Sequence, residues 1–109
     1  MIMNATDWNT ALFEKMSDEQ DKFRDWLKSQ PPEEILHHTY EYTVREDIVM
    51  AMEELELTDA QAQALLESPS PLADVYRYFE KLETGYMDVI RDSIESRADD
   101  VCRAKEELR

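Results

Sequence analysis

The sequence predicts an all-α fold, an antiparallel bundle of three long helices and one short helix in a single domain over residues 1–109. Apolar residues recur at helical spacing along most of the chain, which is typical of amphipathic helices. One glycine and four prolines are too few for a turn-rich sandwich or barrel. Short connections between consecutive helices favour antiparallel neighbours. We expect the helices at about 7–29, 32–55, 59–67 and 71–106.

The first helix is predicted over residues 7–29, where Thr6 or Asn4 is expected to cap it and Asp7 to favour its first turn. Its apolar side chains fall on one face of a helical wheel. Several aromatic residues on such a face usually indicate a packed core, and an exposed binding groove is the second interpretation. The face consists of Trp8, Leu12, Phe13, Met16, Phe23, Trp26 and Leu27.

The second helix is predicted over residues 32–55, because Pro31 and Pro32 interrupt the first helix and suit the first turn of another. Two apolar stripes run along it on opposite sides. A helix that is apolar on two sides is expected to be covered on both, so it should lie between the first and last helices. The wide stripe is Leu36, Tyr40, Val44, Ile48, Met52 and Leu55, and the narrow stripe is Ile35, Tyr42 and Val49.

The two remaining helices begin at clear signals. Thr58 and Gln61 form a capping box before the short helix at 59–67. The last helix should begin after Ser70 and bend at Gly85, because glycine costs about 1 kcal/mol in a helix interior. Its apolar face thins beyond Ser96, which leaves three alternatives for this end: it frays, extends past the bundle or pairs with another copy.

Charge is the most unusual property of the composition. The chain has 26 acidic and 12 basic residues, which gives a formal net charge of −14. Nucleic acids and anionic lipids attract Lys and Arg, so this balance argues against direct binding to either and favours a basic protein partner. A single cysteine, no membrane-length apolar run and no basic segment typical of a secretory signal predict a cytoplasmic protein.

Catalytic and cofactor sites are not indicated. Glu34 and His37 have the E-x-x-H spacing of helix-bundle di-metal sites, but such sites need a second pair and the chain has only two histidines. We expect His37 at the core edge beside Glu41 and His38 on the outside. Cys102 has no neighbouring base, and neither a glycine-rich phosphate loop nor a nucleophile elbow is present. The sequence therefore predicts no cofactor, no bound metal and no enzymatic activity.

Acidic residues are concentrated in one span. Residues 29–76 contain eleven acids and one base, Arg45, and so carry −10 of the net charge. A one-signed run forgoes helix-supporting pairs and adds self-repulsion, which suits a binding surface, although acidic surfaces also serve solubility alone. A second row follows the last helix at intervals of about 5–6 Å, close to the phosphate spacing of one nucleic-acid strand. The candidate partner-binding residues are Glu33, Glu34, Glu41, Glu46, Asp47, Glu53, Glu54, Glu56, Asp59, Asp88, Asp92, Glu95 and Asp99.

Two stretches resemble a known family: YEYTVREDIVMAM at 40–52 and LLESPSPLADVYRYFEKLETGYMDVIRDSIESRA at 65–98. They are similar to a small uncharacterised family, a domain of unknown function, of gut Firmicutes and their mobile, conjugative-type elements. The similarity extends over most of the chain from Phe13 onward. It implies no activity and no residue role. It implies a genetic setting in which small acidic proteins often disable host defence or regulate transfer.

The leading hypothesis is a non-enzymatic inhibitor or adaptor whose acidic helices occupy a basic surface on a partner. Its most concrete form is a nucleic-acid mimic, whose carboxylates replace phosphates in a nuclease or another nucleic-acid-binding protein. The alternative is a helical interaction module that uses an apolar interface, including a homodimer, formed by Tyr40, Tyr42, Trp26 or the last helix. A metal-dependent enzyme using Glu34, His37 and Glu41 is the third hypothesis.

Overall fold

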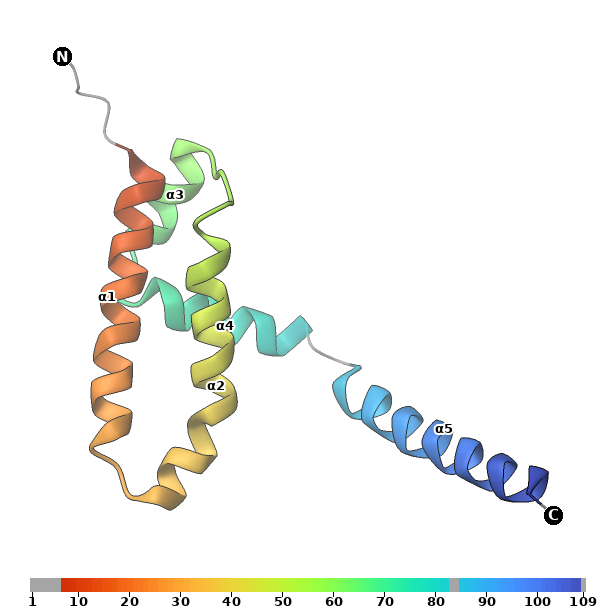
Figure 1. Ribbon diagram of the computed structural model, residues 1–109. Helices are drawn as coiled ribbons and strands as arrows, with labels where there is room; N and C mark the ends of the chain where they lie inside the picture. Colours follow the sequence, from red (N-terminus) through yellow and green to blue (C-terminus); the bar gives the residue numbers. More distant parts are fainter. Residues whose placement is uncertain (1–6, 83–84, 109) are drawn as a thin grey trace. The chain divides into compact units, whose positions relative to one another are not determined.

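The computed structural model describes residues 7–82 and 85–108, and these residues form five α-helices and no strand (Figure 1). The prediction of an all-α fold is confirmed. The chain divides into two compact units, Met1–Tyr78 and Phe79–Arg109. The helices are α1 (Trp8–Lys28), α2 (Pro32–Ala51), α3 (Asp59–Leu66), α4 (Pro71–Leu82) and α5 (Tyr86–Glu107).

Helix α1 begins at Asp7, whose carboxylate accepts hydrogen bonds from the backbone N–H of Thr10 at 3.1 Å and from its hydroxyl at 2.6 Å. These bonds hold the pKa of Asp7 below its ordinary value, and the bond from the Thr10 hydroxyl has the larger effect. The two residues expected to cap this helix, Thr6 and Asn4, lie outside the described residues. Asp7 is the N-cap itself rather than a first-turn residue, so its side chain satisfies a backbone donor at the helix end.

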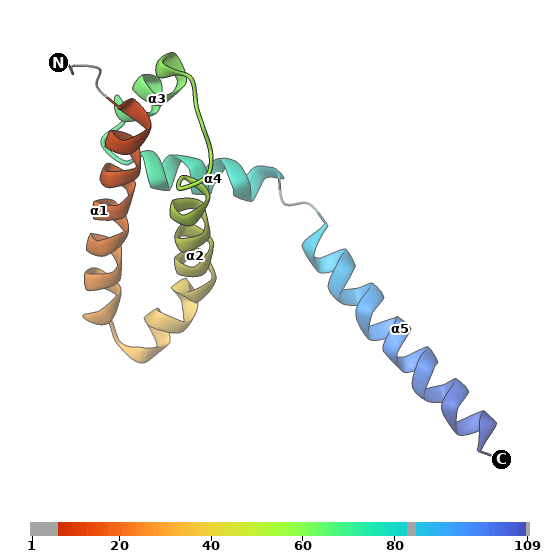
Figure 2. The same ribbon diagram turned by 45° about the horizontal axis from the view of Figure 1, so that its top comes forward.

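Helices α1 and α2 lie side by side in both views and run in opposite directions, joined by the short connection at 29–31 (Figures 1 and 2). Pro31 is extended and Pro32 is the first helical residue, as the sequence predicts. Helix α2 ends at Ala51, four residues before the predicted end. Three carboxylates follow at 53, 54 and 56, and negative charge is unfavourable at the C-terminal end of a helix.

Helix α1, not α2, is the central helix of the first unit, because it contacts both α2 and α3. Side chains along α1 also hold the following segments. Asn9 exchanges two hydrogen bonds with the backbone of Leu57, at 2.9 and 3.0 Å. Lys15 donates to the carbonyl oxygens of Leu66 and Ser68, at 2.9 and 2.6 Å, where α3 ends. The prediction that the second helix lies between the first and the last is not confirmed.

The side of α2 that faces α1 carries the narrow apolar stripe. The Tyr42 ring stacks on Phe23, and its hydroxyl accepts a hydrogen bond from Nε of Arg24 at 2.9 Å. The wide stripe is buried only near its end, at Met52, whereas Leu36 is 72% exposed and Tyr40 is also exposed. The expectation that this helix is covered on both sides is wrong for the first part of the wide stripe, where Leu36 and Tyr40 are exposed.

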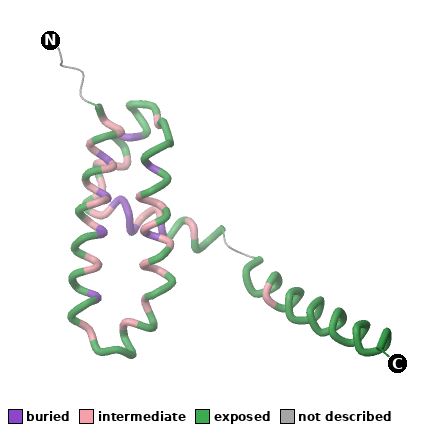
Figure 3. Tube along the Cα trace, in the orientation of Figure 1, coloured by how far each residue is buried: buried purple, intermediate pink, exposed green. Residues whose placement is uncertain are grey.

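The hydrophobic core of the first unit gathers residues from four segments, which Figure 3 colours as buried. Around it pack half-buried apolar side chains such as Trp8, Phe13, Ile48 and Val49. The capping box at Thr58 is present as predicted, since the Gln61 backbone donates to the Thr58 hydroxyl and the Thr58 backbone donates to Gln61. The core consists of Leu12, Met16, Met52, Ala62 and Leu72.

Two helices occupy the part of the chain for which one helix over 71–106 is predicted. Helix α4 ends at Leu82, and α5 begins after Gly85, which is its N-cap residue. The interruption therefore lies beside the residue at which a bend is expected. Glycine is the poorest helix former after proline, and this one has no side chain to cap the following helix. Every residue of α5 is described, and none of them is buried.

Candidate partner-binding surface

The candidate carboxylates of α2 do not form one continuous exposed row. Glu33 and Glu34 are exposed in the first turn, and the next exposed candidate is Asp47. Asp47 lies thirteen positions after Glu34, which is roughly 20 Å along a helix. The two candidates between them, Glu41 and Glu46, are half-buried.

Both carboxylates have partners within the protein, and Glu46 holds the two helices together. Glu46 accepts a hydrogen bond from Nε2 of Gln20 at 2.9 Å and forms an ion pair with Arg24 at 3.4 Å. Glu41 pairs with Arg45 at 2.9 Å and lies 3.3 Å from Nδ1 of His38. Because these carboxylates already have partners inside the protein, they are poorly placed to bind another molecule.

Arg45 is the most informative side chain of this region. It is the only base of residues 29–76, all of which are described, and it is 8% exposed. Its guanidinium lies 4.3 Å from the centre of the Phe23 ring and 3.9 Å from a carboxylate oxygen of Glu19. Glu19 in turn accepts the backbone N–H groups of Leu72 and Ala73, each at 2.9 Å, at the start of α4. Arg45 therefore contributes to the packing of three helices rather than neutralising the surface.

The densest group of exposed carboxylates lies at the C-terminal end of α2, in the connection to α3 and at the first residue of α3. We call these five residues the acidic cluster. Within the described residues, no Lys, Arg or His nitrogen lies within 4 Å of their carboxylates, whereas other acids of the chain have such partners. The acidic cluster consists of Asp47, Glu53, Glu54, Glu56 and Asp59, all of them exposed.

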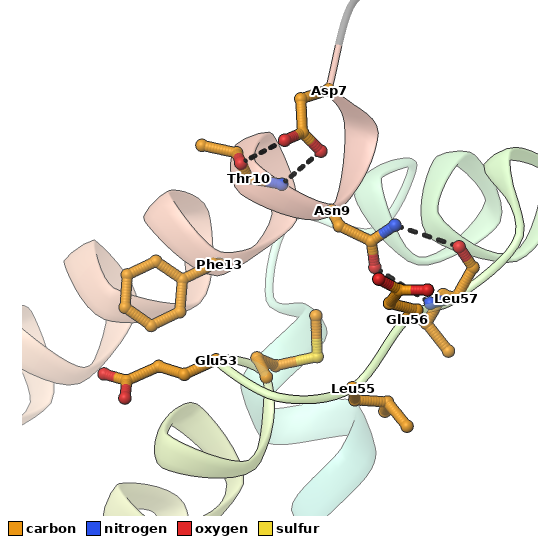
Figure 4. Close-up of a pocket in the computed structure, with 9 residues that line it drawn as sticks. Asp7, Asn9, Thr10, Phe13, Glu53, Leu55, Glu56 and Leu57 are labelled. Carbon is orange, nitrogen blue, oxygen red and sulfur yellow. Dashed lines mark hydrogen bonds between the residues drawn. The ribbon is translucent and has the colours of Figure 1, made fainter.

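A pocket of about 450 Å³ opens beside the acidic cluster (Figure 4). It combines three carboxylates with an apolar wall that includes the Phe13 ring. The hydrogen bonds between Asn9 and Leu57 fix the connection that forms one side of it. Sequence patterns gave no sign of this pocket, because Asn9 and Leu57 are 48 positions apart. The lining residues are Asp7, Asn9, Thr10, Phe13, Met52, Glu53, Leu55, Glu56 and Leu57.

The two histidines have the opposite orientation from the one predicted. His38 is half-buried, with its ring edge-on to Trp26 at 5.2 Å between centroids and a nitrogen 3.8 Å from Glu34. His37 is exposed. His38 shares the α1-facing side of α2 with Tyr42 and Arg45, four and seven residues later. Over residues 7–82 and 85–108, no three His, Cys, Asp or Glu side chains are grouped so that they could hold a metal ion.

The carboxylates predicted on the last helix, Asp88, Asp92, Glu95 and Asp99, are all exposed on α5. Asp88 forms an ion pair with Arg91 at 2.9 Å, and Asp100 pairs with Arg103. This row therefore carries both signs of charge, in contrast to the acidic cluster.

The comparisons with known proteins give one finding. A family model described as a protein of unknown function (DUF3848) matches residues 8–102. No curated protein and no solved structure matches the chain. None of the helices in the described residues combines the length and the apolar character that crossing a membrane requires.

Proposed function

Because the chain belongs to the DUF3848 family, whose function is unknown, we propose a function from its charged surface: the protein binds a basic surface of another protein. The observation that carries this proposal is the inward position of Arg45. Because that base is buried, residues 29–76 expose no Lys or Arg side chain, whereas seven candidate carboxylates of the span are exposed. Such a field attracts cationic surfaces and repels nucleic acid.

The position of the acidic cluster supports binding over a purely structural role. Asp47, Glu53 and Glu54 lie at the C-terminal end of α2, where the helix dipole is already negative. They have no ion-pair partner among the described residues, and they repel one another. These charges lower the stability of the fold, so their presence is better explained by an interaction outside it.

The pocket beside the cluster suits a lysine or arginine side chain of the partner. Two of its carboxylates, those of Glu53 and Glu56, match a cationic head group, whereas that of Asp7 caps α1. The Phe13 ring and Leu55 match the apolar stem of such a side chain, and an aromatic face also attracts a cation. A buried, well-matched cation of this kind is what gives a charged interface its specificity.

We propose further that the partner is a nucleic-acid-binding protein or nuclease, in which the carboxylates take the place of phosphates. The resemblance to proteins of gut Firmicutes and their mobile elements supports a setting in which the target belongs to host defence. The protein would then act in the cytoplasm as a non-enzymatic inhibitor. The acidic cluster, rather than all thirteen predicted residues, is the part of the surface that we expect to carry the interaction.

The experiment compares two variants of equal net charge. In the first, Glu53, Glu54 and Glu56 are all replaced by Gln. In the matched control, three exposed acids of α1 are neutralised by Glu14→Gln, Asp18→Asn and Asp25→Asn. The probes are purified nucleases and DNA-binding proteins from a Firmicutes host, each measured with and without its own nucleic acid as competitor.

We expect at least one probe to bind and nucleic acid to compete. The first variant should bind about tenfold more weakly, since three exposed charges contribute roughly 0.5 kcal/mol each. The control variant should bind as the natural protein does, and added salt should weaken all three. If every probe binds both variants equally, or none binds at low salt, the proposal is wrong.

A further inference from the structure

Helix α5 is long and amphipathic, and none of its residues is buried. It has 22 residues, and most of its large apolar side chains are exposed, with Ile94 64% and Leu108 just beyond it 88% exposed, while Ile90 is half-buried. A single helix of this length is only marginally stable in water, because helices in proteins gain most of their stability by packing an apolar face. The apolar face of α5 therefore requires something to cover it.

The spacing of that face is the spacing of a coiled coil. Core-type positions recur at alternating intervals of three and four residues over three heptads. Most of them are apolar, and Val101 and Ala104 continue the pattern through the part of the helix where a simple apolar stripe thins out. The positions are Met87, Ile90, Ile94, Arg97, Val101, Ala104 and Leu108.

The residues that flank this face favour a second copy of the chain as the partner. In a parallel pair of helices, a residue just before one core position faces the residue five places later on the other helix. Asp100 would face Lys105 of the second copy, and Tyr86 would face Arg91 of the second copy. Because the pair is symmetric, each contact would occur twice. In an antiparallel pair the flanking positions of Arg91 and Lys105 face each other, which places like charges together. We propose that α5 forms a parallel two-stranded coiled coil with α5 of a second copy.

The existing ion pairs of α5 do not prevent this pairing. Asp100 pairs with Arg103 and Arg91 with Asp88 within the helix, and all four side chains are more than half exposed. Exposed ion pairs of this kind contribute little to stability, so replacing them by contacts across the dimer costs little free energy.

Arg97 occupies a core position and sets the strength of the dimer. Its aliphatic stem can pack between the helices while the guanidinium reaches water. A charged residue at a core position weakens a coiled coil and fixes its register. We therefore expect a reversible dimer rather than a permanent one, and we expect Arg97→Leu to tighten it at least tenfold.

The first experiment measures the mass of the full chain by sedimentation equilibrium over a range of concentrations. The natural protein should pass from 12.9 kDa to twice that mass as concentration rises. Ile94→Asp should stay monomeric at every concentration, with the near-ultraviolet spectrum of Trp8 and Trp26 unchanged as evidence that α1 remains packed. A natural protein that stays monomeric near millimolar concentration, or a dimer that survives Ile94→Asp, would overturn the proposal.

The second experiment tests the parallel pairing. Asp100→Lys alone and Lys105→Asp alone each place like charges across the dimer, so each should dimerise at least tenfold more weakly. An equimolar mixture of the two variants should recover dimers, because each helix then faces an opposite charge on the other. In a Cys102→Ser background, Leu108→Cys should also form a disulfide between copies on mild oxidation. Failure of the mixture to recover dimers means that the parallel arrangement is wrong. Neither experiment depends on the proposed basic partner.

Discussion

Arg45 carries a positive charge that is buried within the fold and not presented on the surface. In the sequence, Arg45 is the only base within a long acidic span. In the structure its guanidinium lies on the Phe23 ring and bridges Glu41 and Glu19. A buried charge is stable only with such partners, and its removal leaves carboxylates close together without compensation. Arg45 therefore belongs to the interior of the fold.

The prediction at this scale is that Arg45→Ala lowers the free energy of unfolding by about 2 kcal/mol. This is less than the loss for a fully buried pair, because Glu19 and Glu41 retain some contact with water. Arg45→Lys should recover part of the loss, since lysine keeps the charge but cannot form the same forked contact. Urea unfolding followed by tryptophan fluorescence measures both. The control is Arg91→Ala on α5, whose exposed pair should change stability by less than about 0.5 kcal/mol. Equal effects at the two positions would contradict this assignment.

At the scale of one element, α2 carries carboxylates at both ends, and the two ends have opposite consequences. Glu33 and Glu34 lie in the first turn, where negative charge meets the positive end of the helix dipole. Glu53 and Glu54 follow the last turn, which has no basic residue. The first pair stabilises the helix and the second pair destabilises it.

Neutralising the two ends should therefore change stability in opposite directions. We expect Glu54→Gln to raise the free energy of unfolding and Glu33→Gln to lower it, each by about 0.5 kcal/mol at low salt. Chemical denaturation at low salt, and again at 1 M salt, measures the effect, which screening should reduce. A decrease for both variants would show that Glu54 has a structural partner in solution.

At the scale of the whole molecule, the net charge of −14 opposes folding at neutral pH through self-repulsion. Raising the ionic strength from 0.01 to 0.15 M shortens the screening length from about 30 to about 8 Å. We expect the melting temperature to rise over this range, because screening should raise the free energy of unfolding by about 1 kcal/mol. Binding to a basic partner should weaken over the same range. Differential scanning calorimetry measures the first effect, and a melting temperature that falls with salt would contradict it.

Much of the fold can be predicted from the sequence because its signals are local. Pro31 and Pro32 mark the start of α2, Thr58 and Gln61 cap α3, and Gly85 lies where the last predicted helix divides. Each of these residues acts on its own turn of backbone. The end of α2 is not among these signals, because the sequence predicts it at residue 55 and the helix ends at Ala51.

The side of α2 that faces α1 could not be predicted from apolar periodicity. That choice depends on polar side chains of another helix, such as Gln20, Glu19 and Arg24, which bond to α2. The orientation of His38 and the inner roles of Glu41 and Glu46 follow from it. The pocket depends in the same way on Asn9, which holds a segment 48 residues later in the chain. These are long-range contacts with no signature in the local sequence.

The inward position of Arg45 also has an evolutionary consequence. The acidic cluster holds no helices together, so its members can be exchanged one at a time while every intermediate protein stays folded. Substitutions in the acidic cluster can therefore change the surface charge without altering the interior. We expect sequence divergence among relatives to concentrate on the outer carboxylates, while the residues around Arg45 change together or not at all.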